Sequence, residues 1–331
     1  MSQSNFTARC AAPTSRLGLG AWAFGRTGWG AQDDRDSRAA ILRAIELGVS
    51  WIDTAAVYGD GHSENLVGAT LAQCSEADRP LVYTKGGLRV DRVSGVTVRD
   101  LSPGSLREQC QESLRRLRVE RIDLYQLHWP VDDHRVVEQA CACLRELQAE
   151  GKIHRIGVSN FDLPLLKRCT EHYPIDVVQV PLSLLSRAGG GDLLPWSTEH
   201  GVRALTYSPL ESGLLSGHFS KQRLQALPRS DWRRERVQFR QPRLDRTLEL
   251  LDRLEPIAAS CDISLAQLAI AWTLTWPGVA GAIVGARSAA QVDGWAGASE
   301  VRLDAFTVDQ IDSALIATGA GQGPTHPNRR A

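Results

Sequence analysis

The segments IDLYQLH at residues 122–128 and IHRIGVS at residues 153–159 flank residues 133–150, in which apolar side chains recur at helical spacing. Both flanking segments are short and rich in Val, Ile and Leu, which favours strands that are covered by helices. A strand, a helix and a second strand in this order predict a βαβ unit with parallel strands. The rest of the chain repeats this pattern on both sides.

The alternation of strands and helices extends along most of the 331 residues. We expect strands over residues 17–22, 49–54, 81–85, 122–128, 153–159, 177–180, 202–207 and 282–284. Helices are expected over residues 36–47, 63–73, 103–117, 133–150, 163–172, 193–200, 243–261, 264–275 and 288–295. Eight strand–helix units in succession predict a closed parallel (β/α)8 barrel, the TIM barrel, in an α/β single domain over residues 1–331. An open doubly wound sheet is the alternative.

The composition excludes several classes of protein. Hydrophobic residues make up 43% and charged residues 23%, which allows a sizeable core and excludes general disorder. The 38 basic and 38 acidic residues cancel, which argues against a nucleic-acid or membrane-surface protein. Seven scattered cysteines without a Cys-x-x-Cys pair, and a start without a signal-peptide pattern, predict reduced thiols, no metal site and a cytoplasmic location.

A long basic loop follows the seventh expected strand. Residues 221–246 contain nine basic and three acidic side chains, a net charge of +6. Because the loop follows a strand, it lies on the face of a barrel that carries active sites. It is either a flap that holds an anionic ligand or a solvated surface insertion.

Ionisable residues gather where adjacent strands end. Asp53 ends the second strand, Tyr58 lies in the turn after it, Lys85 ends the third strand and His128 ends the fourth. In a barrel these positions surround one cavity. A carboxylate at Asp53 keeps Lys85 charged, and the ammonium of Lys85 lowers the pKa of Tyr58, which becomes a proton donor for a developing alkoxide while His128 orients the carbonyl oxygen. The alternative is a structural Asp53–Lys85 ion pair with Tyr58 merely nearby.

Six segments in order resemble signatures of the aldo-keto reductase family. They are DTAAVYG (53–59), YTKG (83–86), LYQLHWP (124–130), GVSNF (157–161), YSPL (207–210) and IVGAR (283–287). The resemblance covers nearly the whole chain. It implies a barrel that reduces aldehydes and ketones with a nicotinamide dinucleotide, usually NADPH, and a catalytic tetrad of Asp53, Tyr58, Lys85 and His128 with Tyr58 as proton donor.

The resemblance also implies where the coenzyme and the substrate bind. Ser159, Asn160 and Gln179 match the residues that hold the carboxamide, and Tyr207 matches the aromatic ring that stacks on the nicotinamide. The loop around the pyrophosphate is matched by Ser208, Leu210, Gly213 and Gly217, and the substrate walls are matched by Trp22 and Trp129.

The adenosine end departs from the family pattern. Gly285, Arg287 and Gln291 match, and guanidinium suits a 2′-phosphate. The family often has an acidic residue and an asparagine next, but Gly294 and Trp295 stand there. The match at Arg287 predicts NADPH as the coenzyme, with NADH as a possible substitute. The segment Gly18-Leu19-Gly20 does not fit the dinucleotide fingerprint of open sheets.

The predicted function is NADPH-dependent reduction of a small aldehyde or ketone by hydride transfer from C4 of the nicotinamide. The flat faces of Trp22, Trp29 and Trp129 indicate a polar, sugar-like, aromatic or pyridoxal-like carbonyl. Two alternatives stay open. One is a non-catalytic nicotinamide-binding subunit or redox sensor, and the other is a Schiff-base lyase with Lys85 as nucleophile.

Overall fold

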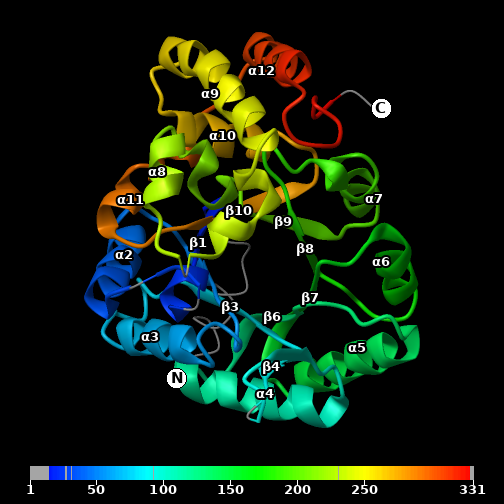
Figure 1. Ribbon diagram of the computed structural model, residues 1–331. Coiled ribbons are helices and arrows are strands. Elements are labelled where there is room, and N and C mark those ends of the chain that lie inside the picture. Colours follow the sequence, from blue (N-terminus) through cyan, green and yellow to red (C-terminus); the bar gives the residue numbers. More distant parts are fainter. Residues whose placement is uncertain (1–14, 27, 31, 92, 230, 329–331) are drawn as a thin grey trace.

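Eight parallel strands close into a barrel in the computed structural model, which describes residues 15–26, 28–30, 32–91, 93–229 and 231–328 (Figure 1). Around the barrel the order is β1-β10-β9-β8-β7-β6-β3-β2. The strands are β1 (Leu17–Gly20), β2 (Trp51–Asp53), β3 (Leu81–Gly86), β6 (Ile122–Leu127), β7 (Ile153–Ser159), β8 (Val177–Pro181), β9 (Arg203–Tyr207) and β10 (Val279–Gly285). The predicted (β/α)8 barrel is confirmed, and the doubly wound alternative is wrong.

The helices form a ring outside the strands (Figure 1). They are α2 (Asp34–Glu46), α3 (His62–Leu71), α4 (Pro103–Leu117), α5 (His134–Ala149), α6 (Leu163–Thr170), α7 (Leu193–Glu199), α9 (Arg243–Ser260), α10 (Leu265–Leu274), α11 (Ala289–Asp293) and α12 (Ala305–Thr318). Helix α5 shows why they form: Val137, Ala140, Leu144 and Leu147 recur at helical spacing and are all buried. Each such aliphatic side chain contributes about 1.5–3 kcal/mol when it leaves water.

The barrel interior is filled with side chains. A small inner core consists of Trp51, Tyr83, Leu124, Val177, Leu205 and Ile283. The rings of Trp51 and Tyr83 stack with centroids 5.1 Å apart. Gly18 leaves room for this stack, because a Cβ atom there would lie 2.3 Å from the Trp51 ring. The glycine pair at residues 18 and 20 therefore serves packing.

Some elements differ from the prediction. The first strand ends at Gly20, and Trp22 lies in the short 3-10 helix η1 (Trp22–Gly25) rather than in the strand. The last predicted helix is only the five residues of α11. The prediction also lacked the antiparallel hairpin of β4 (Leu88–Val90) and β5 (Thr97–Arg99), the short helix α8 (Lys221–Ala226), and α12.

Two further features of the described residues concern the helices and the cysteines. No single helix among them is long and apolar enough to cross a membrane; α9 and α10 together have the length and composition of a span but are bent by 87°. The six described cysteines are free thiols, and Cys10 lies outside the described residues.

Candidate active site

A buried ion pair joins two neighbouring strands at the carboxyl end of the barrel. Asp53 ends β2 and Lys85 stands on β3, with 3% and 1% of their surfaces exposed. The Lys85 ammonium donates to the Asp53 carboxylate and, over 3.0 Å, to the carbonyl oxygen of Thr54. Burial lowers the pKa of Lys85, and the adjacent carboxylate opposes that change.

The second oxygen of Asp53 is held by two amides. Gln179 Nε2 donates to Asp53 Oδ2 over 2.9 Å, and Gln126 Nε2 approaches the same oxygen at 3.4 Å. Gln179 also donates to Gln126 Oε1 over 3.2 Å. All three side chains are buried, so this network compensates the removal of the carboxylate from water.

Tyr58 and His128 complete the cluster predicted from the strand ends. The Lys85 Nζ atom lies 5.4 Å from the centroid of the Tyr58 ring. The rings of Tyr58 and His128 meet edge to face, with centroids 5.6 Å apart. His128 directly follows β6 and is buried, and both burial and the charge of Lys85 hold its pKa well below the ordinary value. His128 is therefore a neutral imidazole.

The predicted pKa shift of Tyr58 is wrong in direction. Burial of the phenol and the negative charge of Asp53 raise its pKa above the ordinary value. The ammonium of Lys85 was expected to lower it, but Asp53 is paired with that ammonium and offsets its charge. Tyr58 consequently remains protonated across the whole neutral range.

The residues predicted to face the nicotinamide surround the end of β7. Tyr207 donates its hydroxyl proton to Asn160 Oδ1 over 2.7 Å, which fixes the tyrosine ring. Asn160 Nδ2 donates to the His128 carbonyl oxygen at 3.0 Å and to Ser159 Oγ at 3.1 Å. The Asn160 amide is thus engaged within the protein, while Gln179 Oε1 meets no donor among the described residues.

The loop after β9 has a strained backbone. Ser208, Glu211 and Ser212 all have positive φ angles, of 57°, 44° and 57°, which non-glycine residues rarely adopt. Gly213 follows with φ 98° in the 3-10 helix η3 (Glu211–Ser216), which Leu210 precedes and Gly217 follows. Such strain collects at ligand-binding loops.

Two arginines converge beyond this loop. Arg287 Nε donates to Gln32 Oε1 over 2.7 Å, and the Arg287 backbone N–H donates to Gln291 Oε1 over 2.8 Å. Arg233 donates to the Ser212 carbonyl oxygen at 3.3 Å. Burial and the positive charge of Arg233 lower the pKa of Arg287, whereas the carboxylate of Asp231, which pairs with Arg233 over 2.7 Å, opposes the change.

The positions that depart from the family pattern do not form a polar site. Trp295 is buried in the main core. Gly294 ends the helix α11, and Gly285 is the exposed last residue of β10.

Three tryptophans make an aromatic cover beside Tyr58, which we call the tryptophan roof: Trp22, Trp29 and Trp232. Their ring centroids lie between 5.0 and 5.3 Å apart. The Trp22 centroid is 6.4 Å from that of Tyr58. The Trp232 backbone N–H donates to the Gly28 carbonyl oxygen over 3.2 Å, so the basic loop folds back on the loop after β1.

The second predicted substrate wall, Trp129, contacts a side chain of the β4–β5 hairpin. Trp129 directly follows His128 and is 38% exposed. The guanidinium of Arg99, from the β4–β5 hairpin, lies 5.2 Å from its ring centroid and donates to the Pro130 carbonyl oxygen over 2.8 Å. The hairpin therefore holds this aromatic face in place.

The sequence pattern of the Aldo/keto reductase family matches residues 16–316. The chain belongs to this family. The reductase is consequently an NAD(P)H-dependent oxidoreductase that acts on carbonyl and CH–OH groups, as its motifs predicted.

The comparisons include well-covered relatives. The "NADH-specific methylglyoxal reductase" of Escherichia coli is 32% identical over 290 residues, which cover 84% of this chain and 87% of that protein. The glycerol dehydrogenase AKR11B4 from Gluconobacter oxydans has a TM-score of 0.84 and 34% identity over 96% of this chain and 95% of that one. An aldo/keto reductase from Klebsiella pneumoniae in complex with NADP and acetate has a TM-score of 0.68 and 26% identity, covering 96% and 95%.

Several residues that contact or adjoin the predicted site residues were absent from the prediction. Gln126 is a polar residue inside an apolar strand, and Glu64 is a fully buried carboxylate that accepts from Thr84 Oγ1 over 2.6 Å. The position of Gln126 inside an apolar strand was a signal that could have identified it. Gln32 and Trp232 gave no signal, because their partners are more than 200 residues away in the chain.

Proposed function

We propose that this reductase transfers hydride from NADPH to a small polar aldehyde or ketone, with Tyr58 as the proton donor. The observation that carries the proposal is the cluster of Tyr58, Lys85, Asp53 and His128 at the carboxyl ends of β2, β3 and β6. A panel of carbonyl compounds, followed by the loss of nicotinamide absorbance, tests it.

The proton step follows from the groups present. When bound, the coenzyme supplies hydride to the carbonyl carbon, and negative charge develops on the carbonyl oxygen. Tyr58 gives its hydroxyl proton to that oxygen, and the ammonium of Lys85 stabilises the phenolate that remains. Neutral His128 donates a hydrogen bond to the same oxygen and orients it. Burial lowers the pKa of Lys85, and the carboxylate of Asp53 opposes this change and favours the charged ammonium.

The residues present fit a phosphorylated dinucleotide. Gln179 Oε1 and Ser159 Oγ would hold the carboxamide, and the Tyr207 ring would lie against the nicotinamide. Arg287 and Arg233 would hold the 2′-phosphate and the nearby phosphate oxygens. Trp29 and Trp232 each bury an indole N–H that has no acceptor in the described part of the chain, and a ligand oxygen would satisfy it.

Replacing Arg287 by alanine is expected to raise KM for NADPH by about 10- to 100-fold, because a charge-assisted hydrogen bond is lost. KM for NADH should change little, since NADH has no 2′-phosphate. Both constants are measured by initial rates, with Arg253→Ala as the matched control at an exposed arginine of α9. If the wild type used NADPH and NADH equally well, the assignment of Arg287 to the 2′-phosphate would be wrong.

The proposed substrate is small because the tryptophan roof covers the site. Trp22 lies beside Tyr58, and Trp232 packs against Trp22. The names of two relatives, a methylglyoxal reductase and a glycerol dehydrogenase, support three-carbon polar compounds. Among the predicted classes we therefore favour the polar, sugar-like carbonyls.

Replacing Trp232 by alanine should open the roof and change specificity. We expect kcat/KM for a three-carbon carbonyl to fall about tenfold relative to that for a bulky aromatic aldehyde, the size of discrimination that a hydrophobic wall provides. Rates with both substrates give the ratio. Trp196→Ala, at a tryptophan of α7, is the matched control. An unchanged ratio would show that the roof does not contact the substrate.

The Schiff-base alternative has less support. It requires a neutral amine with free access to a carbonyl carbon. The Lys85 Nζ atom instead donates to Asp53 and Thr54 and is almost fully buried.

A further inference from the structure

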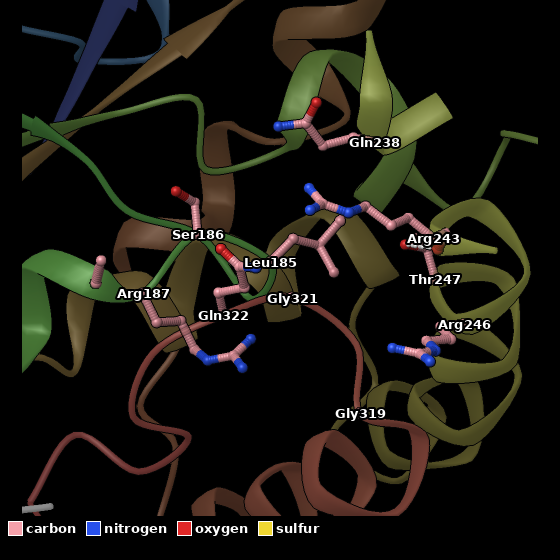
Figure 2. Close-up of a pocket in the computed structure, with 11 residues that line it drawn as sticks. Leu185, Ser186, Arg187, Gln238, Arg243, Arg246, Thr247, Gly319, Gly321 and Gln322 are labelled. Carbon is pink, nitrogen blue, oxygen red and sulfur yellow. Dashed lines mark hydrogen bonds between the residues drawn. The ribbon is translucent and has the colours of Figure 1, made fainter. Parts of the chain in front are cut away.

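A second pocket is lined by none of the proposed catalytic and coenzyme residues. Figure 2 shows the residues that line it. Its volume is about 250 Å³. It is lined by Leu185, Ser186, Arg187, Ala188, Gln238, Arg243, Arg246, Thr247, Gly319, Gly321 and Gln322. None of these residues has a role in the function proposed above.

Three segments form the walls. The turn after β8 carries Arg187, the first turns of α9 carry Arg243 and Arg246, and the chain after α12 supplies residues 319–322. The Arg187 backbone N–H donates to the Gln322 carbonyl oxygen over 2.9 Å, which ties the end of the chain to the turn. Figure 2 shows Arg187 on one side of the pocket and the two α9 arginines on the other.

Arg187 is a buried cation, with 3% of its surface exposed. Its guanidinium donates to the carbonyl oxygens of Leu184, Ala320, Gly323 and Pro324. It forms no ion pair with a described residue. Burial lowers its pKa to about 10, although the charge of Asp312 opposes the change. A buried guanidinium without a contacting carboxylate favours an anion in the adjoining pocket.

The two α9 arginines add positive charge without any counter-charge in contact. The guanidinium groups of Arg243 and Arg246 form no hydrogen bond or ion pair with any residue that the structure describes. Asp245 stands between them in sequence but pairs with Lys221 and Gln241. The positive end of the α9 dipole lies at the same place.

The lining contains no Asp or Glu among the described residues, so three guanidiniums dominate its field. Ser186, Thr247, Gln238 and Gln322 add neutral polar groups. Guanidinium forks match the geometry of phosphate oxygens. The volume corresponds to roughly eight water molecules, which exceeds a phosphate group and leaves space for a short carbon chain.

We propose that this pocket binds a phosphate dianion, carried by a small phosphate monoester or present as the free ion. Arg187 supplies the buried charge at one wall, and Arg243 and Arg246 contact the phosphate oxygens from α9. The site is independent of the proposed reductase activity. Arg187 also serves the fold through its carbonyl contacts, so the test leaves it in place.

The test is isothermal titration calorimetry with glycerol 3-phosphate and with inorganic phosphate. The protein is first saturated with NADPH, so that the coenzyme occupies its own phosphate sites, and the titration is repeated without NADPH. With NADPH bound we expect one site per chain, and a further site that appears only without NADPH is that of the coenzyme. Tighter binding of glycerol 3-phosphate assigns a monoester, and equal binding of both probes assigns the free ion.

The decisive comparison uses the double variant Arg243→Gln, Arg246→Gln. Its dissociation constant should be at least about tenfold weaker, because two charge-assisted contacts are lost. Arg253→Gln, which changes an exposed arginine farther along α9, should bind as the wild type does. No heat from either probe with the wild type, or unchanged affinity in the double variant, overturns the proposal.

Discussion

Tyr58→Phe is expected to lower kcat for carbonyl reduction by about 10²- to 10⁴-fold, the contribution of a positioned general acid. The substitution removes one oxygen atom and keeps the ring, so its packing against Trp22 and His128 is retained. The affinity for NADPH should stay unchanged, because no proposed coenzyme contact involves the Tyr58 hydroxyl. Steady-state rates and coenzyme fluorescence measure the two quantities.

The pH dependence provides a second readout for Tyr58. Burial and Asp53 raise its pKa, so the protonated donor persists above the pH at which an ordinary tyrosine, with a pKa near 10, ionises. Ionisation of Tyr58 should therefore cause no fall in the rate of carbonyl reduction between neutral pH and pH 10. A fall near neutral pH that disappears in Tyr58→Phe would show that Lys85 lowers the pKa after all.

A matched substitution separates loss of the proton donor from general damage to the site. Tyr173→Phe removes the hydroxyl of a tyrosine that follows α6, far along the chain from the cluster. It should retain wild-type rates. If Tyr58→Phe also retained them, another group would be the proton donor and the proposed mechanism would fail.

The barrel could be predicted because its signal repeats. Each strand is a short apolar run, and the interval to the next holds a helical pattern, so errors at single boundaries do not change the topology. Helix α12 was missed although Val308, Ile311 and Leu315 follow helical spacing and are buried. Its pattern lies beyond the eighth unit, where the barrel repeat no longer indicates what to expect.

The cluster of ionisable residues could be predicted for the same reason. Asp53, Lys85 and His128 end strands, or directly follow them, and strand ends of a closed barrel meet at one rim. The pKa of Tyr58 could not be predicted, because its direction depends on burial and on how Asp53 and Lys85 share their charge. Both burial and charge pairing are properties of the folded structure that the sequence alone does not give.

The tryptophan roof and the basic loop could be predicted from the sequence only in part. The net charge of the loop predicted an anion-holding flap as one of two readings, and Arg233 does lie near Arg287. The charge count contained no information on Trp232, which packs on Trp22 and Trp29. Loop conformation over a distance of 200 residues is set by tertiary contacts that local sequence does not encode.

Asp53→Asn is expected to lower the free energy of unfolding by about 3–5 kcal/mol, because it leaves the buried ammonium of Lys85 without its counter-charge. Urea denaturation followed by circular dichroism measures the loss. The new amide also replaces a carboxylate that accepts from Gln179 and Gln126, so part of the network loses strength.

The loss of stability in Asp53→Asn should become smaller as pH rises. Without the carboxylate, burial depresses the pKa of Lys85 in the folded state further below its unfolded value near 10.4. The unfolded chain then binds more protons than the folded one, so the stability of the variant rises as pH rises toward 10. The wild type should show a weaker rise over the same range.

The double variant Asp53→Asn, Lys85→Met distinguishes an unpaired charge from a packing defect. Methionine fills much of the lysine volume without a charge, so the double variant should regain a large part of the stability that Asp53→Asn loses. The double variant should lack reductase activity, because the phenolate of Tyr58 would have no ammonium beside it. If the double variant were no more stable than Asp53→Asn, an unpaired ammonium would not be the cause of the loss, and Asp53 would stabilise the fold mainly through its amide partners.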